Sequence, residues 1–395
     1  MNTISLINRV KYNKYIYTIY YHIGSCLINL LKLFINTDDK LIVFVSFGGR
    51  KFDDSPKAIY DAMLVDQRFI HYQLVWAFIH PKQHEITRGR KIKIDTFTYY
   101  KTLLRARVWI TNSSMTRGLH FTGKNTFELN TWHGSAIKKM GHDISLSNTS
   151  FVVRRNKKRN KSIMLAQGSY DVKVFSKAFH RSVDNFKVIG LPRNDVLTNV
   201  TPLKQKQIRK KLDLPDGKII ILYAPTFREY DKDANKNCTM TLPINIQKWE
   251  KNLGQDFILL FRCHYEVVKN INVVDNKFVR NVSNYPNLNE LMIASDVLIS
   301  DYSSIFFDYS ILVKPMLCFT YDYERYEKER GMYFDIREEL KPEAFDNEDS
   351  LITGLLHIDF EKCQKITTLF RSKYVEKYGN SSQECLDLII SNIVQ

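Results

Sequence analysis

Five short stretches place histidine, arginine and hydroxyl side chains directly after apolar runs that predict β-strands. In chain order they are NTWHGSAIKKMGHD (130–143), GLPRNDVL (190–197), YAPTFRE (223–229), FRCH (261–264) and SDYSS (300–304). Ligands of parallel α/β sheets bind at the carboxyl ends of the strands, so we expect these stretches to contribute to one site. Guanidinium and hydroxyl groups bind pyrophosphate, and an imidazole can accept a proton from a hydroxyl group. The combination therefore predicts a site that holds a pyrophosphate and activates a hydroxyl.

The last of these stretches lies within a predicted strand–helix–strand unit. Residues 297–300 indicate a buried strand, a turn and a helix follow, and residues 316–319 indicate the next strand. Such a unit builds parallel sheet. The start of its helix offers unpaired N–H groups, and Ser303 and Ser304 add two hydroxyls, which favours phosphate binding. The simpler interpretation is that Asp301 or Ser303 only caps the helix.

His133 directly follows a predicted strand at 126–132, and Gly134 lets the chain turn sharply there. An imidazole takes up a proton near neutral pH, as a general base for an alcohol nucleophile must. A single histidine is also commonly a structural hydrogen-bonding group. The neighbouring Lys138 and Lys139 would add the positive potential that a polyphosphate site requires.

Two further stretches supply phosphate donors. Arg193 follows a predicted strand at 186–189 and offers a planar guanidinium, although a surface ion pair with Asp195 explains it equally well. Thr226 follows the strand at 219–223 and offers a hydroxyl, with Arg228 as its charged neighbour.

The FRCH stretch ends a predicted strand at 257–261. Arg262 is expected on the face opposite Cys263, and His264 leaves the end of the strand. A second imidazole at His264 could protonate a phosphate oxygen or donate a hydrogen bond to it.

The elements that must position these residues alternate between strand and helix in both halves of the chain. We therefore predict a doubly wound α/β protein with an acceptor-side domain at 38–200 and a donor-binding domain at 201–395. The expected features are strands at 41–47, 73–78 and 108–111, a helix capped by Ser55 with Pro56 at its first position, a charged helix at 204–211 and a helical stretch at 361–394 that returns to the first domain. Two such domains facing across a cleft suit a nucleotide-diphosphate donor.

Composition narrows the class of partner. The chain has 395 residues, 44% of them hydrophobic, and a net charge of +16, which predicts an anionic partner: nucleic acid, lipid head groups or a phosphate-rich substrate. No nucleic-acid-binding motif is present, so we expect no nucleic acid. The six cysteines form no CxxC pair, which argues against a zinc site or disulfide framework and favours a reduced, cytoplasmic setting. The basic run at 154–161 is either a solvated face or a contact with anionic lipid or a polyanionic acceptor.

Residues 16–35 form an apolar run that is about long enough to span a bilayer. His22, Asn29 and Lys32 interrupt it, and no small-residue cleavage site follows, which argues against a secretory signal peptide. We expect residues 1–37 to form a helical segment that lies on the inner, anionic membrane surface. A helix packed on the protein's own core and a true membrane span are the alternatives.

Together with FGGRKFDDSPKAIYDAM (47–63), these stretches resemble the CDP-glycerol glycerophosphotransferase family, the teichoic acid primases and polymerases of Gram-positive cell walls. The resemblance covers about residues 40–375. It implies a GT-B-like fold of two Rossmann-like domains and peripheral attachment to the cytoplasmic face of the cell membrane. It also implies transfer of glycerol phosphate from CDP-glycerol, with release of CMP, to an undecaprenyl-diphosphate-linked saccharide or a growing poly(alditol phosphate).

Carried over by position, the resemblance makes His133 the general base and His264 a second catalytic group. The implied donor-binding residues are His133, Gly134, Ser135, Ala136, Ile137, Arg193, Pro225, Thr226, Arg262, Cys263, His264, Ser303, Ser304 and Asp308. Ser135-Ala136 departs from the family's frequent Thr-Pro, and Tyr265 from its frequent Pro. No cofactor is expected, although Asp301 and Asp308 could recruit Mg²⁺. The alternatives are CDP-ribitol as donor, a nucleotide-sugar glycosyltransferase, and a non-catalytic basic protein that binds membrane or nucleic acid.

Overall fold

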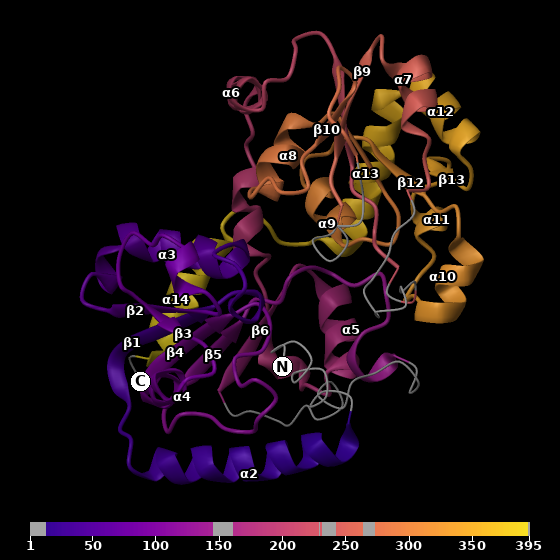
Figure 1. Cartoon of the computed structure of the whole chain (residues 1–395). Coiled ribbons are helices and arrows are strands. Elements are labelled where there is room, and N and C mark those ends of the chain that lie inside the picture. The colour runs from indigo at the N-terminus through magenta and orange to yellow at the C-terminus, as the bar shows by residue number, and fades with distance from the viewer. Residues whose placement is uncertain (1–12, 145–160, 229, 231–241, 264–272, 394–395) are drawn as a thin grey trace. The chain divides into compact units, whose positions relative to one another are not determined.

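The computed structural model describes residues 13–144, 161–228, 230, 242–263 and 273–393 (Figure 1). The chain divides into two compact units, and neither is continuous in sequence. Unit 1 comprises Met1–His133, Met140–Asp195 and Glu376–Gln395, and unit 2 comprises Gly134–Lys139 and Val196–Val375. The sequence analysis placed residues 201–395 in one domain. The structure instead groups the last twenty residues with unit 1, because the final helix packs into the core of that unit.

Unit 1 contains a fully parallel sheet in the order β3-β2-β1-β4-β5-β6-β7. Its strands are β1 (Asp38–Val45), β2 (Gln73–Phe78), β3 (Arg90–Lys93), β4 (Ala106–Thr111), β5 (Phe127–Asn130), β6 (Ser162–Ala166) and β7 (Phe186–Val188). Side chains of β1 alternate between two cores, with Ile42 and Phe44 on one face and Val43 and Val45 on the other. The sheet is therefore buried on both faces, as its nearly continuous apolar strands require.

Each face of this sheet has its own helices. Helices α3 (Asp54–Val65) and α14 (Ser381–Ile393) cover the face of Ile42, where Cys385, Leu386 and Ile389 are fully buried. Helix α4 (Phe97–Arg105) and α2 (Lys14–Leu33) lie on the opposite face, while α5 (Ser169–Ala178) packs beside β6 and β7. The expected return of the C-terminal helices to the first domain is thus confirmed for α14.

Unit 2 repeats this architecture with a second parallel sheet, in the order β10-β9-β8-β11-β12-β13. Its strands are β8 (Ile219–Tyr223), β9 (Phe257–Phe261), β10 (Val279–Asn281), β11 (Val297–Ser300), β12 (Met316–Phe319) and β13 (Ala344–Phe345). Its helices are α6 (Pro202–Lys211), α7 (Ile246–Leu253), α8 (Leu288–Ala294), α9 (Ile305–Ser310), α10 (Tyr323–Arg330), α11 (Ile336–Glu339), α12 (Glu348–Leu356) and α13 (Phe360–Tyr374). The doubly wound α/β prediction is confirmed for both units.

In both sheets the strand order reverses beside the first strand of the unit. The reversal lies between β1 and β4 in unit 1 and between β8 and β11 in unit 2. Ligands of open parallel sheets bind outside the carboxyl ends of the strands at this switch point. The ends of these four strands are therefore where a functional site is expected.

Several predicted boundaries were wrong by a few residues. The strand predicted at 41–47 ends at Val45, because the following residues form a short 3₁₀ turn, and the one at 126–132 ends at Asn130. Helix α3 begins at Asp54 with Asp53 at its N-cap position, instead of being capped by Ser55. Ser55 is fully buried, and its own N–H donates to Asp54 Oδ1 at 2.6 Å.

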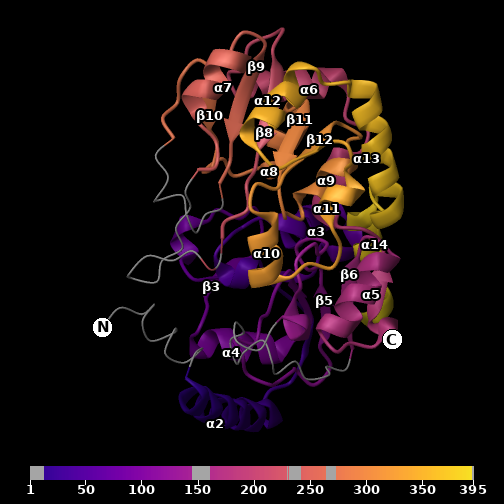
Figure 2. The ribbon, with the colours of Figure 1, turned by 90° about the vertical axis from the view of Figure 1, so that its right-hand side faces the viewer.

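Helix α2 is held to unit 1 by hydrogen bonds and by Ile28 and Leu31, which pack against the core of that unit. Tyr17 and Tyr20 donate to the carbonyls of Gly118 and Arg117 at 3.1 and 2.9 Å, and Asn29 donates to His120 O at 2.8 Å. Figures 1 and 2 show α2 as the outermost element of unit 1. Among the described residues, no helix combines the length and apolar character needed to cross a bilayer.

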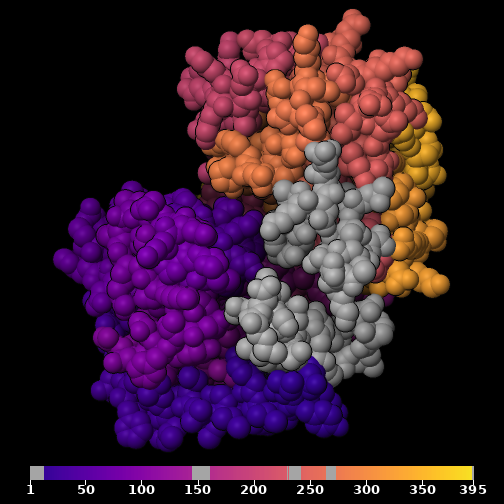
Figure 3. All heavy atoms as spheres, viewed as in Figure 1, coloured from indigo at the N-terminus to yellow at the C-terminus, as the bar shows by residue number. Residues whose placement is uncertain are grey.

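The opposite face of α2 is apolar and turned outward. An exposed stripe runs along it at helical spacing, with side chains that are 54–64% accessible: Ile19, Ile23, Leu27, Leu30 and Leu33. We call these five residues the apolar stripe of α2. In the space-filling view the atoms of α2 form a continuous ridge at the surface of unit 1 (Figure 3). This helix therefore presents to solvent the face that a helix of a globular protein normally buries.

Candidate active site

His133 stands just beyond the end of β5, in a tight backbone turn. Its neighbours Trp132 and Gly134 have φ angles of 52° and 137°. His133 Nδ1 lies 2.7 Å from the carbonyl oxygen of Asn112, at the end of β4. A carbonyl oxygen only accepts, so Nδ1 carries the proton and, in the neutral ring, Nε2 carries the lone pair. The fold therefore orients this imidazole as a base through Nε2.

Asn112 also joins the two strand ends at the switch point of unit 1. Its Oδ1 accepts from the Phe47 N–H at 2.8 Å, and the neighbouring Ser113 Oγ accepts from Gly48 N–H at 3.1 Å. Asn112 is fully buried, and no described residue accepts a hydrogen bond from its Nδ2. The ring of Trp132 stacks on His133 with centroids 4.2 Å apart. His133 is thus fixed at the place where parallel sheets bind ligands.

Arg193 forms an ion pair with Asp54, the first residue of α3. Its Nη1 lies 2.7 Å from Asp54 Oδ2, and the two side chains are largely buried. Asp195 instead accepts from the N–H groups of Ser381 and Ser382 at 2.9 and 2.7 Å, which caps the start of α14. The pairing of Arg193 with Asp54 is therefore largely buried, and the positive charge of Arg193 lies at the start of α3.

Thr226 and Asp301 meet at the switch point of unit 2. Thr226 N–H donates to Asp301 Oδ1 at 2.9 Å, just beyond the end of β8, and Pro225 beside it is buried. Thr226 is only 8% exposed, and its hydroxyl has no hydrogen-bond partner among the described residues. A buried hydroxyl without a partner is costly, so it is suited to a ligand that supplies one.

Arg228 locks this region together. Its guanidinium pairs with Asp301 at 2.9 Å and with both oxygens of Asp322 at 2.7 and 2.8 Å. Burial alone would lower the pKa of Arg228, but the charges of Asp301 and Asp322 raise it overall. The sequence suggested only a charge partner here, because the two carboxylates lie 73 and 94 residues further along the chain.

Aromatic rings enclose this guanidinium. The rings of Tyr302, Tyr321 and Tyr326 lie 5.0–5.1 Å from its central carbon. Both oxygens of Asp301 already accept, from Arg228 and from the Thr226 and Tyr302 N–H groups. Asp301 Oδ2 therefore keeps one lone-pair site, but the adjacent positive charge of Arg228 disfavours a cation there.

The serine turn after β11 shows the predicted helix cap, and phosphate binding there stays a prediction. Ser303 Oγ accepts from the Ile305 N–H at 3.3 Å, as a helix-capping hydroxyl does. Ser304 occupies the N-cap position of α9 without a side-chain capping bond, and both serines are partly exposed. Asp308, expected to complete the donor site, is only 3% exposed on α9. The turn can therefore meet a ligand more directly than Asp308 can.

Residues Gly134–Lys139 belong to unit 2, although His133 belongs to unit 1. Backbone hydrogen bonds hold this segment, from Tyr333 N–H to Ile137 O at 2.8 Å and from Lys139 N–H to Gly331 O at 3.0 Å. The side chains of Ser135, Ala136 and Ile137 are buried. The proposed base is thus one peptide bond away from a segment anchored in the other unit.

Arg262 and Cys263 mainly serve the fold at the end of β9. Arg262 Nη1 donates to the carbonyls of Val282 and Tyr285 at 3.1 and 2.7 Å. Cys263 is buried, and burial raises the pKa of its thiol. His264, like most of the basic run at 154–161, lies outside the described residues.

Comparison with known proteins identifies the family. The family described as CDP-Glycerol:Poly(glycerophosphate) glycerophosphotransferase matches residues 27–391. The teichoic acid poly(glycerol phosphate) polymerase of Staphylococcus epidermidis RP62A is 32% identical over 91% of this chain and 51% of its own length. The teichoic acid glycerol-phosphate transferase of Staphylococcus aureus NCTC 8325 is 31% identical over 88% of this chain and 92% of its own. The chain thus spans about half of the first relative and nearly all of the second.

A solved structure agrees with this relationship. A variant of the wall teichoic acid polymerase TagF, soaked with CDPG, superposes with a TM-score of 0.82 and 31% identity, covering 93% of this chain and 92% of that one. The parallel sheets and the family match over most of the chain lead to one conclusion. The chain belongs to the CDP-glycerol:poly(glycerophosphate) glycerophosphotransferase family.

Proposed function

We propose that the protein transfers glycerol phosphate from CDP-glycerol to a hydroxyl of a lipid-linked teichoic acid precursor and releases CMP. The observation that carries this proposal is the hydrogen bond from His133 Nδ1 to Asn112 O at the switch point of unit 1. It directs the basic Nε2 away from the carbonyl that orients the ring. Family membership supports the donor and the reaction class.

In the proposed reaction, His133 Nε2 accepts the proton of the acceptor hydroxyl. The acceptor oxygen attacks the phosphorus that carries glycerol, and the bond from that phosphorus to the bridging oxygen breaks. CMP leaves with the electron pair. Phosphoryl transfer depends mainly on positioning and on stabilising charge on the phosphate oxygens. We assign that role to Arg193, Thr226, the Ser303–Ser304 turn and His264.

The proposal has three further parts. The two parallel-sheet units correspond to the two Rossmann-like domains of the GT-B class, with the donor on unit 2 and the acceptor on unit 1. The acceptor is an undecaprenyl-diphosphate-linked saccharide or a growing poly(alditol phosphate). The proposed reaction requires no tightly bound metal, and the cationic Arg228 beside Asp301 supports this.

We also propose that the protein binds the cytoplasmic face of the membrane peripherally through the apolar stripe of α2. The polar face of this helix is occupied by hydrogen bonds to unit 1, and its apolar face is exposed. An amphipathic helix of this kind lies in the plane of a lipid interface. In vesicle flotation, the double variant Ile23→Ser/Leu27→Ser should lose most of its binding to lipid, because each side chain contributes about 1.5–3 kcal/mol when buried. Val183→Ser, at a similarly exposed apolar residue of unit 1, is the matched control.

The reaction is tested by CMP release from CDP-glycerol and, in parallel, from CDP-ribitol, with a lipid-linked disaccharide acceptor and with EDTA present. We expect acceptor-dependent release from CDP-glycerol that His133→Ala abolishes. His71→Ala removes an exposed histidine of unit 1 and serves as the control. CMP release from CDP-ribitol alone would identify CDP-ribitol as the donor in place of CDP-glycerol. Release from neither, or release that persists in His133→Ala, would refute the assignment, and salt-sensitive DNA binding without CMP release would favour a nucleic-acid-binding protein.

A further inference from the structure

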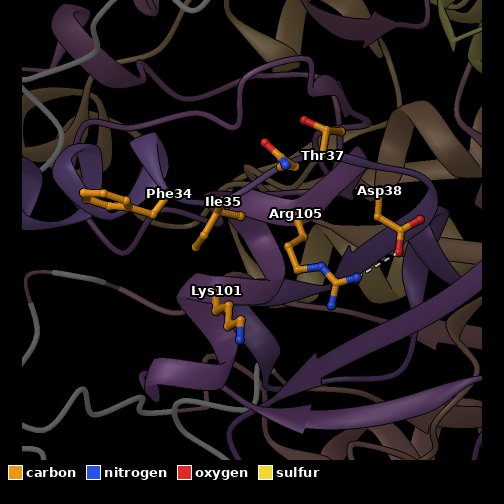
Figure 4. Close-up of a pocket in the computed structure, with 7 residues that line it drawn as sticks. Phe34, Ile35, Thr37, Asp38, Lys101 and Arg105 are labelled. Atoms are coloured by element: carbon orange, nitrogen blue, oxygen red, sulfur yellow. Dashed lines mark hydrogen bonds and ion pairs between the residues drawn. The ribbon is translucent and has the colours of Figure 1, made fainter.

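A pocket of about 510 Å³ opens where α2 ends and the chain enters β1 (Figure 4). Its walls come from the end of α2, from the segment that follows, and from α4. The lining residues are Phe34, Ile35, Asn36, Thr37, Asp38, Lys101 and Arg105. The pocket lies within unit 1, and none of its residues belongs to the site described above.

One wall of the pocket is cationic. Lys101 and Arg105 lie four residues apart on α4 and so share one face of that helix. Arg105 pairs with Asp38 at 3.1 Å, and Asp38 also accepts from Gln73 Nε2 at 3.3 Å. Among the described residues, none forms an ion pair with Lys101, which is exposed. The carboxylate of the pocket is therefore already matched, while a positive charge is left for a ligand.

A further cation borders the same place. Lys124 Nζ donates to Leu33 O, the last carbonyl of α2, at 3.2 Å and lies 3.4 Å from Asn36 Oδ1. It offsets the partial negative charge of this helix end, which would otherwise repel an anion. The electrostatics of the pocket thus favour a small anionic group such as a phosphate.

The other wall continues the apolar stripe of α2. Phe34 is 80% exposed and follows Leu30 and Leu33 along the helix. A cationic wall beside an exposed apolar strip is complementary to an amphiphile with a phosphate head and hydrocarbon chains. A free anion would use only the first of these features.

We propose that this pocket binds the head-group phosphate of an anionic glycerophospholipid, with Lys101 as its principal cation, while the acyl chains lie along the apolar stripe of α2. This inference rests on the peripheral membrane binding proposed above, and it gives that binding a lipid preference. The pocket would make the enzyme prefer membrane regions rich in anionic lipid.

The test uses the full-length protein and compares Lys101→Gln with Lys187→Gln. Lys187 is an exposed lysine on β7, so its removal costs the same charge away from the pocket. Flotation is measured with phosphatidylcholine vesicles and with vesicles that also contain phosphatidylglycerol. We expect Lys101→Gln to weaken binding to the anionic vesicles about fivefold, the effect of one cation near an anionic surface, and to leave binding to the neutral vesicles unchanged. Equal effects of the two variants would overturn the proposal, because they would reflect net charge alone.

A second measurement separates the lipid from a free anion. Dihexanoyl phosphatidylglycerol below its critical micelle concentration and inorganic phosphate are titrated separately into wild type and Lys101→Gln by calorimetry. We expect binding of the short-chain lipid that the variant weakens, and much weaker binding of phosphate. Equal affinities for the two, or no binding of the short-chain lipid, would overturn the proposal.

CMP release with a water-soluble acceptor distinguishes this inference from the proposed function. Lys101→Gln should release CMP at the wild-type rate, because the pocket is separate from the transfer site. A loss of that activity would place Lys101 in the reaction and overturn the lipid assignment. If the wild type released no CMP but still bound the short-chain lipid through Lys101, the proposed function would fail while the lipid pocket stood.

Discussion

Replacing Arg228 with methionine should destabilise unit 2 far more than the loss of an ordinary ion pair. The side chains of Arg228 and Asp301 are each only 3% exposed, and Asp322 receives two more hydrogen bonds from the same guanidinium. Removing one partner of a buried pair costs about 3–5 kcal/mol, because the remaining charge stays buried without compensation. Asp301 keeps two backbone N–H donors, so we expect a loss at the lower end, about 3 kcal/mol.

Unfolding of the two units can be followed separately by fluorine NMR. The chain has four tryptophans, of which Trp249 alone lies in unit 2, fully buried in its core. In protein labelled with 5-fluorotryptophan, a urea titration of the Trp249 signal therefore reports unit 2. With a urea dependence of about 2 kcal/mol per molar, a loss of about 3 kcal/mol lowers the midpoint by about 1.5 M.

Arg209→Met is the matched control. Arg209 pairs with Asp296 at 2.6 Å in the same unit, but the two side chains are 19% and 25% exposed. Solvent then screens the remaining carboxylate, and we expect a loss of about 1 kcal/mol and a midpoint shift of about 0.5 M. If the two variants lowered the Trp249 midpoint equally, burial of the Arg228 network would not be the source of its stability.

Three further perturbations follow from the buried groups of the two units. Thr226→Val should leave stability within about 1 kcal/mol of wild type, since the hydroxyl has no partner among the described residues. In CMP-release kinetics it should raise the KM for CDP-glycerol about tenfold. Thr226→Ser keeps the hydroxyl and should leave that KM unchanged. Leu386→Ala should lower the free energy of unfolding of unit 1 by about 2–5 kcal/mol. The urea titration should show this loss at the fluorinated Trp76 and not at Trp249. An equal loss at both signals would contradict the assignment of α14 to unit 1. Burial lowers the pKa of Lys314 from 10.5 to about 8. Below pH 8 the buried amine is charged, which lowers the free energy of unfolding by the full amount. This penalty disappears as the pH rises to 10.5. Relative to Lys314→Met, the wild type should gain up to about 3 kcal/mol across that range in thermal unfolding, and a constant difference would refute the shift.

Most central strands could be predicted from the sequence because their burial dictates their composition. The predicted strands at 73–78, 219–223, 257–261, 297–300 and 316–319 are confirmed at both ends. Each is an apolar run that is covered on both faces, so no other element accommodates it as well. Strands β3, β6, β10 and β13 were not predicted. Arg90–Lys93 is mostly charged, and Ala344–Phe345 has only two residues.

The sequence predicted where the site residues lie, but not which partners they bind. The positions after strand ends could be read from the sequence, since parallel sheets place their ligands there. The partner of Arg193 could not be predicted from the sequence, because Asp54 lies 139 residues away. Asp195, which is only two residues away, caps α14. The hydrogen bond that sets the tautomer of His133 involves a backbone carbonyl. Every residue has such a carbonyl, so the sequence does not show which one takes part.

The position of α14 has a consequence for how the protein is made. Asp195 caps this helix, and the N–H groups of Glu376 and Lys377 donate to Gln167 O at 2.9 and 3.0 Å. The 180 residues from Val196 to Val375 are therefore an insertion into unit 1, and the residues on both sides of the insertion belong to unit 1. During translation, the part of the sheet face carrying Ile42 and Phe44 that α14 covers stays exposed until Ser381–Ile393 has been synthesised. A truncation before Ser381 would thus remove part of the interior of unit 1, and we expect such truncated chains to be substrates for chaperones and proteases.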